Sequence, residues 1–273
     1  DYRSEPVRRM VVIGESNAFG MCAIEPRNEW VQTLANLIRD FQDEPLQVFN
    51  NAIPANVIGP ESPGYGTMVG TKPSALERYK TDLIALKPDL AVIAYGLNDA
   101  RCGNPAGKFL RDLEKIISDT RREANSLIVL TSPYWVPQFD PGLLDSMKVQ
   151  HNYGPAPFNK VGREPVLSYV VGMREIAERY DCIFVDFFMA NEGAVWLLND
   201  DMVHYNDVGQ RVIGQLVFNA IAARCSFIGR KSIRQAREGR FSIANTGGTN
   251  AMSKWIEIWH EKINEILKPR PTR

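Results

Sequence analysis

The sequence lacks the features that mark several specialised classes of protein. Its formal net charge is zero at pH 7, so no overall field exists to attract nucleic acid or an anionic membrane. No apolar run approaches the roughly 18–20 residues of a membrane-spanning helix, so we expect no membrane span. The four cysteines are scattered and form no C-x-x-C pair, which argues against a zinc site and favours free thiols. We therefore expect neither a nucleic-acid partner nor a bound metal.

The composition is that of an ordinary globular protein. Hydrophobic residues make up 44% of the 273 positions and charged residues 23%, and a chain of this length can bury a sizeable core without disulfides. The chain starts at Asp1, without Met or a signal peptide, which fits either a processed precursor or a trimmed chain. We expect a soluble protein, either cytoplasmic or secreted after removal of a signal peptide.

Five β-rich runs alternate with five amphipathic helical patterns. The β-rich runs cover residues 8–14, 46–53, 90–96, 126–133 and 182–188. The helical patterns cover residues 29–41, 74–87, 108–123, 165–180 and 207–224. Three of the runs are nearly continuous in apolar residues, which is typical of strands buried on both faces of a parallel sheet. The alternation predicts an α/β protein with a doubly wound parallel sheet, in which ligands bind beyond the carboxyl ends of the strands.

Residues 134–164 form a long connection with four prolines and no sustained period. Loops of this length are usually functional or disordered, and the many aromatic side chains argue against disorder. Flat apolar faces with polar tips suit hydroxylated rings. The side chains of this loop that we expect to contact a substrate are Tyr134, Trp135, His151 and Tyr153.

The C-terminal part differs from the rest in composition. Residues 226–250 are polar and predominantly basic, which is typical of a linker, and residues 251–268 have the spacing of an amphipathic helix. We therefore divide the chain into a domain at 1–225 and a tail at 226–273. The tail helix can pack on its own domain or form a homodimer contact, and the first alternative is favoured.

The first apolar run stops abruptly at Gly14-Glu15-Ser16, and three roles are open for Ser16. A phosphate-binding Walker loop carries a lysine that this stretch does not have, so that role is disfavoured. Serine is also a common residue at the start of a helix, where it caps the first turn. The third role, a nucleophile, requires a base and an acid that orients the base.

One histidine of the three has a carboxylate at a useful distance in sequence. His204 follows Asp201 by three residues and precedes the start of a helix, so the carboxylate can reach the imidazole. His151 lies in the long loop and His260 in the tail helix. The pattern therefore predicts a nucleophile, base and acid in Ser16, His204 and Asp201.

Four motifs occur in a fixed order along the chain: "GESNAFG", "NNAIPANVIG", "GLND" and "DMVHYNDVG". Asn98 of the third motif is either a turn or capping residue or a side-chain donor to a developing oxyanion. Together the four motifs resemble those of the SGNH or GDSL hydrolase superfamily, over roughly residues 8–224.

The chain departs from the family pattern at two places. Glu15 stands where the family usually has Asp, which is a mild departure. In the second motif, Ala52 and Ala55 stand at the positions of the family's two glycines. The last of these supplies a backbone N–H to the oxyanion hole, and alanine retains that N–H provided that φ is negative. Ala55 is the expected donor, with Gly59 as the alternative if the turn is longer.

The resemblance implies a three-layer α/β/α, flavodoxin-like domain of about five parallel strands. It also implies that Ser16 is the nucleophile, His204 the base and Asp201 the orienting acid. The implied oxyanion hole consists of the N–H groups of Ser16 and Ala55 with the amide of Asn98. No metal or organic cofactor is needed.

The expected activity is that of a serine esterase. We expect hydrolysis of short acyl esters, above all O-acetyl esters of a carbohydrate, through an acyl-enzyme. The alternatives are hydrolysis of another short ester (aryl ester, thioester or lipid), acyl transfer, and a catalytically silent binding module. Labelling by a fluorophosphonate probe would distinguish an active serine from the silent module.

Overall fold

The computed structural model describes residues 1–67, 72–140, 142–143, 156–160, 162–238 and 257–264. Its centre is one parallel sheet of five strands in the order β2-β1-β3-β4-β5. The strands are β1 (Arg9–Gly14), β2 (Gln47–Asn50), β3 (Leu90–Ala94), β4 (Leu127–Thr131) and β5 (Ile183–Val185). This order confirms the expected flavodoxin-like sheet.

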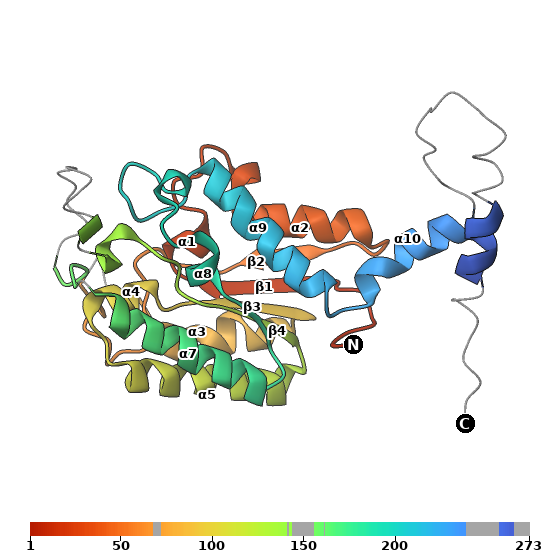
Figure 1. The fold of residues 1–273 in the computed structure, drawn as a ribbon. Helices are drawn as coiled ribbons and strands as arrows, with labels where there is room; N and C mark the ends of the chain where they lie inside the picture. The colour runs from red at the N-terminus through yellow and green to blue at the C-terminus, as the bar shows by residue number, and fades with distance from the viewer. Residues whose placement is uncertain (68–71, 141, 144–155, 161, 239–256, 265–273) are drawn as a thin grey trace. The chain divides into compact units, whose positions relative to one another are not determined.

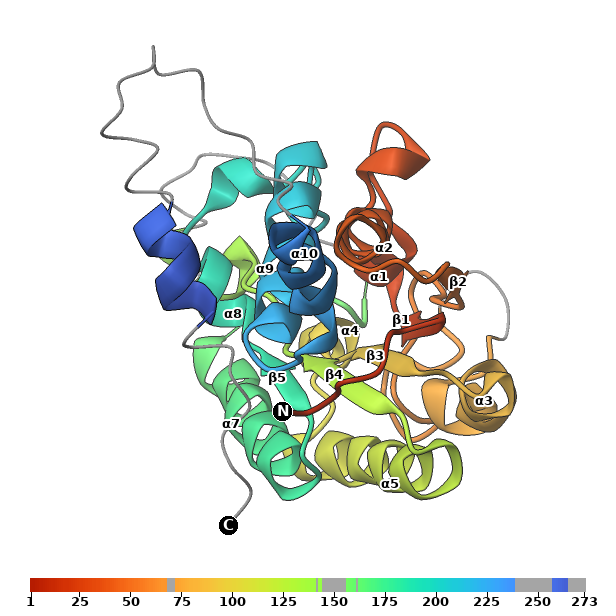
Figure 2. The same cartoon turned by 90° about the vertical axis from the view of Figure 1, so that its right-hand side faces the viewer.

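Helices cover both faces of the sheet, which gives the three expected layers (Figures 1 and 2). One face carries α2 (Trp30–Phe41) and α9 (Asp207–Ala222), and the other carries α3 (Ala75–Asp82), α5 (Ala106–Ala124) and α7 (Arg163–Arg179). Short helical segments lie in the connections between these elements. They are α1 (Ser16–Phe19), η1 (Pro26–Asn28), η2 (Ile84–Leu86), α4 (Leu97–Cys102), η3 (Pro137–Phe139), α8 (Phe187–Asn191) and η4 (Val195–Leu197).

The strands with continuous apolar sequence are the buried ones. Every residue of β4 is buried, whereas β2 at the edge of the sheet alternates between exposed and partly buried positions. The register aligns Gly14 with Ala94, Ala94 with Thr131, and Thr131 with Val185. Four strands therefore end level, and the segments that follow them meet at one edge of the sheet.

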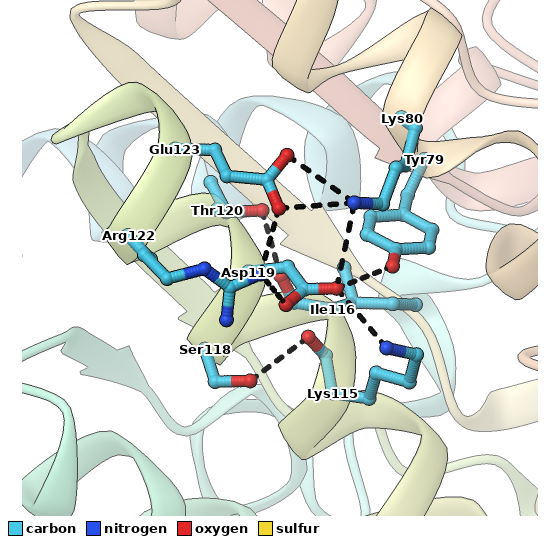
Figure 3. A network of polar contacts seen from close by, with 9 residues as sticks. All are labelled: Tyr79, Lys80, Lys115, Ile116, Ser118, Asp119, Thr120, Arg122 and Glu123. Atoms are coloured by element: carbon cyan, nitrogen blue, oxygen red, sulfur yellow. Dashed lines mark hydrogen bonds and ion pairs between the residues drawn. The ribbon is translucent and has the colours of Figure 1, made fainter.

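Helices α3 and α5 are joined by a network of polar contacts (Figure 3). Asp119 accepts hydrogen bonds from the Tyr79 hydroxyl at 2.6 Å and the Lys115 ammonium at 3.2 Å, and it also pairs with Arg122. The hydroxyl of Tyr79 is the main cause that holds the pKa of Asp119 well below its usual range. This network holds two helices together on one outer layer.

The C-terminal part contains a helix where the composition predicts a linker. Helix α10 spans Phe227–Arg237, and Phe227 and Ile228 at its start are buried. A polar composition with a few buried anchors therefore gave a helix instead of the extended linker expected from residue 226. The chain divides into compact units at Asp1–Ser232 and Ile233–Arg273. Within the second unit, residues 257–264 are helical, as the amphipathic pattern predicts.

Among the described residues, no single helix is long and apolar enough to cross a membrane, and one bent pair, α9 with α10, passes that test on length and composition.

Candidate active site

Ser16 lies where β1 turns directly into α1. A Cβ at Gly14 would lie 2.6 Å from the Cβ of Ala18 and 2.8 Å from the carbonyl oxygen of Ala94, so only glycine permits this close turn. Glu15 occupies the N-cap, and Ser16 is the first residue of the helix. The Oγ atom of Ser16 lies 2.8 Å from Nε2 of His204. Its hydroxyl is thus engaged with the imidazole and does not cap the helix.

The loop before α9 brings Asp201 and His204 together. One oxygen of Asp201 accepts hydrogen bonds from the backbone N–H groups of Val203 and His204, at 3.0 and 2.9 Å. Its other oxygen, Oδ2, lies 2.5 Å from Nδ1 of His204. The hydroxyl, the imidazole and the carboxylate therefore form one continuous line. It joins Ser16, near the start of the chain, to His204 and Asp201, near the end of the domain.

The charges of this line favour a protonated imidazole. Burial lowers the pKa of His204, but the hydrogen bond that its Nδ1–H donates to Asp201 and the contact with Cys22 outweigh burial and raise the pKa to about 9. Burial raises the pKa of Asp201, and its hydrogen bonds with His204 and Val203 reverse this and lower it to about 2. The carboxylate thus stabilises the charge that the imidazole acquires when it takes a proton.

Glu15 binds the start of α4. Its carboxylate accepts hydrogen bonds from the N–H groups of Gly96 at 2.8 Å, Leu97 at 2.8 Å and Asn98 at 2.9 Å. Gly96 has φ +124°, which a residue with a side chain rarely adopts. Burial and the nearby Asp99 raise the pKa of Glu15 to about 8, and the three N–H groups oppose this shift. Sequence reasoning treated this residue only as a replacement for Asp and missed its role.

The third motif also holds the second one in place. The side-chain amide of Asn98 donates to the carbonyl oxygen of Asn56 at 3.0 Å, and Asp99 accepts from the N–H of Ile58 at 2.9 Å. Asp99 is completely buried and binds Asn104 as well, at 2.9 Å. Asp99 thus joins the second and third motifs. Its place directly after Asn98 in "GLND" was the only sequence feature that pointed to this role.

Ala55 has a left-handed backbone with φ +57°, so the condition of a negative φ is not met. An alanine in this conformation costs about 1–2 kcal/mol relative to its preferred regions, whereas glycine adopts it readily. The alternative residue, Gly59, packs against Asp112 of α5, since a Cβ there would lie 2.5 Å from the Asp112 carboxylate. The turn at Ala55 thus keeps a glycine-like backbone without a glycine.

Two of the four aromatic or imidazole residues expected to contact a substrate are buried. Trp135 is 1% exposed and Tyr134 is 2% exposed. The Tyr134 hydroxyl donates to the carbonyl oxygen of Val203 at 2.6 Å, and its ring packs on Tyr205. These two rings therefore fill the core and do not present the exposed flat faces that we expected to contact a hydroxylated ring. Tyr134 supports the loop that carries His204.

His151 and Tyr153, the other two residues of that expectation, lie outside the described residues.

The fold and this site define a class of α/β hydrolytic enzyme. Residues 12–212 match the model of the GDSL-like lipase/acylhydrolase family, and the chain belongs to that family. A comparison with curated protein sequences found no match.

Several solved structures have a similar fold. A lipase/acylhydrolase from Enterococcus faecalis is 21% identical, with a TM-score of 0.60 and coverage of 80% of this chain and 96% of that chain. A catalytic mutant of Axe2, an acetylxylan esterase from Geobacillus stearothermophilus, is 19% identical, with a TM-score of 0.56 and coverage of 80% and 95%. TesA is 18% identical, with a TM-score of 0.59 and coverage of 79% and 99%. At these identities the likeness concerns the fold.

Proposed function

We propose that this enzyme hydrolyses esters through Ser16, His204 and Asp201. The observation that carries the proposal is the line from Oγ to Nε2 at 2.8 Å and from Nδ1 to Oδ2 at 2.5 Å. His204 takes the hydroxyl proton as Ser16 attacks the carbonyl carbon, and then gives it to the leaving alcohol. Asp201 holds the imidazole in the tautomer with its proton on Nδ1 and stabilises the imidazolium. Water releases the acyl group by the same route.

The oxyanion of the tetrahedral intermediate needs donors beside Ser16. The N–H of Ser16 lies in the first turn of α1, where backbone N–H groups have no partner within the helix. The amide of Asn98 carries two hydrogens, of which one binds Asn56. We assign the other hydrogen, with the N–H groups of Ser16 and Ala55, to the oxyanion hole. Glu15 positions Asn98 through its backbone.

The nucleophile is tested with Ser16→Ala and a fluorophosphonate probe. Loss of the hydroxyl should lower turnover by about 10³-fold or more, because the remaining groups cannot form an acyl-enzyme. The probe should label the wild type at Ser16 and leave the variant unlabelled. Cys102→Ala, which also removes a buried polar atom, serves as the matched control and should keep labelling. Normal turnover by a folded Ser16→Ala variant would contradict the proposal, and an unlabelled, inactive wild type would favour a silent binding module.

The base is tested by the pH dependence of kcat/KM. His204 acts only when neutral, so kcat/KM should rise with pH up to the pKa of about 9 and level off above it. Asp201→Asn removes the charge that raises this pKa, so the midpoint should move to lower pH as the rate falls. A flat profile in the wild type would argue against a histidine base.

For the substrate, we propose a short acyl group, such as acetyl, on a carbohydrate. Trp196 in η4 is 72% exposed and lies on the loop that carries Asp201 and His204, anchored by a hydrogen bond from Asn206. An exposed indole offers the flat face that stacks on sugar rings. Axe2, whose fold is similar, is an acetylxylan esterase.

A panel of p-nitrophenyl esters of rising chain length tests the acyl preference, and acetylated xylo-oligosaccharides test the alcohol. Trp196→Ala should weaken hydrolysis of the oligosaccharide more than that of the aryl acetate, whereas equal effects would contradict the sugar contact. Sugar acceptors offered in place of water distinguish acyl transfer from hydrolysis. The alternative that the tail helix forms a homodimer contact is tested by light scattering with and without residues 251–273.

A further inference from the structure

Cys22 lies beside the two residues that we assign as base and acid. Its Sγ atom is 3.9 Å from Oδ2 of Asp201. One ligand atom each from Cys22, Asp201 and His204 lie within 4.8 Å of one another. The imidazole atom that faces this group is Nδ1, because Nε2 is turned towards Ser16. Sulfur, oxygen and nitrogen donors therefore lie close together on the Nδ1 side of the imidazole, away from Ser16.

The position of the sulfur is set by the turn that follows α1. The N–H of Met21 donates to the carbonyl oxygen of Ser16 at 3.0 Å, and the N–H of Ile24 donates to the Asp207 carboxylate at 2.9 Å. Cys22 sits between these anchors with φ +71°, a left-handed conformation that non-glycine residues rarely adopt. The side chain is thus presented to Asp201 by a turn fixed at both ends, and it is partly exposed.

We propose that this group of three side chains binds a thiophilic divalent cation, such as Zn²⁺ or Cd²⁺, and that the bound cation switches off the esterase. Zn²⁺ accepts this set of one thiolate, one imidazole and one carboxylate, and water completes its tetrahedral coordination. Hard cations such as Mg²⁺ prefer an all-oxygen set, which the site does not offer. The proposal that a cation binds here depends only on the geometry of the three side chains, and the proposal that it inhibits rests on the proposed function.

The side chains need only small movements to reach a metal. Ligands bind zinc at about 2.0–2.3 Å, which places them about 3.3–3.8 Å from each other. The Asp201 oxygen, 2.5 Å from Nδ1, must therefore move away from it, and the sulfur, 3.9 Å from that oxygen, must move slightly closer to Asp201. The Asp201 side chain is 41% exposed, so it can rotate without disturbing the core.

The proton balance explains why the bound metal would stop the reaction. The Cys22 thiol loses its proton to solvent when the thiolate binds. A protonated imidazole loses the proton of Nδ1 to solvent as well, whereas a neutral imidazole moves its one proton from Nδ1 to Nε2. Either way, the metal occupies Nδ1 and the remaining proton is on Nε2. That N–H donates to the Ser16 hydroxyl and cannot accept its proton, so the nucleophile is not activated.

The binding test uses Cd²⁺ with the full chain after removal of metals by a chelator. The other three cysteines, Cys102, Cys182 and Cys225, are buried, so an ultraviolet thiolate-to-Cd²⁺ charge-transfer band reports on Cys22. We expect the band to saturate at one equivalent in the wild type and in Ser16→Ala, and to disappear in Cys22→Ala. Absence of the band from the wild type, or its persistence in Cys22→Ala, would overturn the proposal.

The inhibition test compares Zn²⁺ with Mg²⁺ on the wild type and on Cys22→Ala and Cys22→Ser. Zn²⁺ should inhibit the wild type at a concentration at least about tenfold lower than either variant, since loss of a ligand should cost no less than loss of an outer-shell partner. Mg²⁺ should have no effect, and the inhibition of each protein is measured relative to its own rate without metal. Equal sensitivity to Zn²⁺ in all three proteins would overturn the inference. A Cd²⁺ band on a wild type without esterase activity would instead contradict the proposed function and leave the metal site standing.

Discussion

Glu15 and Asp119 are both 4% exposed, yet the groups around them differ in kind. Glu15, at the carboxyl edge of the sheet, accepts hydrogen bonds from three consecutive backbone N–H groups of α4. Asp119, in α5 where that helix contacts α3, is bound by the Tyr79 hydroxyl of α3 and by the ends of Lys115 and Arg122. The pKa of Glu15 is raised to about 8 by burial, whereas that of Asp119 is lowered.

The difference shows which contacts can position a reacting group. Backbone donors have fixed directions, so the carboxylate of Glu15 and the start of α4 fix each other, and Asn98 with them. The cations around Asp119 end long side chains that are more than half exposed, so they compensate charge without fixing an atom. We therefore expect changes at the first region to affect catalysis, and changes at the second to affect stability alone.

In the comparison of these two regions, the largest effect is expected from Asn98→Ala. Removal of one oxyanion donor should lower kcat by about 10²–10³-fold, with a smaller change in KM, because the amide acts on charge that develops in the transition state. Tyr79→Phe, which removes a buried hydrogen bond from the second region, is the matched control and should leave kcat unchanged. Steady-state kinetics on a p-nitrophenyl acetate substrate measure both. A large KM change with normal kcat would make Asn98 a binding residue.

The next effect compares two carboxamide replacements, Glu15→Gln and Asp119→Asn. Above about pH 8, where Glu15 is ionised, the amide of Glu15→Gln would face N–H donors and leave at least one of them without an acceptor. The change should therefore lower the free energy of unfolding by about 1–3 kcal/mol and also reduce kcat. Asp119→Asn should cost about 1 kcal/mol, through its weaker bond to Tyr79, with kcat unchanged. Denaturant unfolding measures the loss of stability of both variants, and steady-state kinetics measure their kcat. Equal loss of kcat would remove the distinction between the regions.

The two carboxylates should also affect stability in opposite directions as the pH changes. Glu15 has a higher pKa in the folded state than its ordinary 4.5, so its contribution should fall as the pH rises from 4.5 to about 8. Asp119 has a lower folded pKa than its ordinary 3.8, so its contribution is present above pH 3.8 and is lost as the pH falls below that value. Differences in unfolding free energy between wild type and each carboxamide variant, measured across this range, isolate the two contributions. If both contributions to the unfolding free energy rose, or both fell, with increasing pH, the opposite pKa shifts of Glu15 and Asp119 would be contradicted.

The smallest effect concerns the backbone of the site. Ala55→Gly should raise the free energy of unfolding by up to about 1 kcal/mol, because glycine adopts φ +57° without strain. The N–H group is retained, so esterase activity should persist. Ala52→Gly, at the other glycine position of the same motif, is the control. Because Ala52 has no positive φ, this change should lower the free energy of unfolding. Destabilisation of Ala55→Gly would show that the alanine side chain contributes packing that outweighs the strain.

Much of the fold followed from local patterns in the sequence. The apolar runs at 8–14, 90–96 and 126–133 predicted buried parallel strands, and β1, β3 and β4 lie within them. The three-residue spacing of Asp201 and His204 predicted their contact, because one turn of backbone settles that distance. Recognition of the four motifs placed Ser16 near them although it lies far away in the chain.

Other features depended on which segments the sheet brings together. No local pattern in the sequence predicts that Trp135 is buried and that Trp196 is exposed. The tie from Glu15 to α4 joins residues about eighty positions apart, and the approach of Cys22 to Asp201 spans still more of the chain. Periodicity and spacing report neighbours within a few residues, so they determined the strands, the helices and the acid–base pair. The parallel strands end level, and the loops that follow them pack against one another at the edge of the sheet. This tertiary packing alone decided the positions of the proposed oxyanion donors, of the buried aromatic side chains and of the sulfur beside the imidazole.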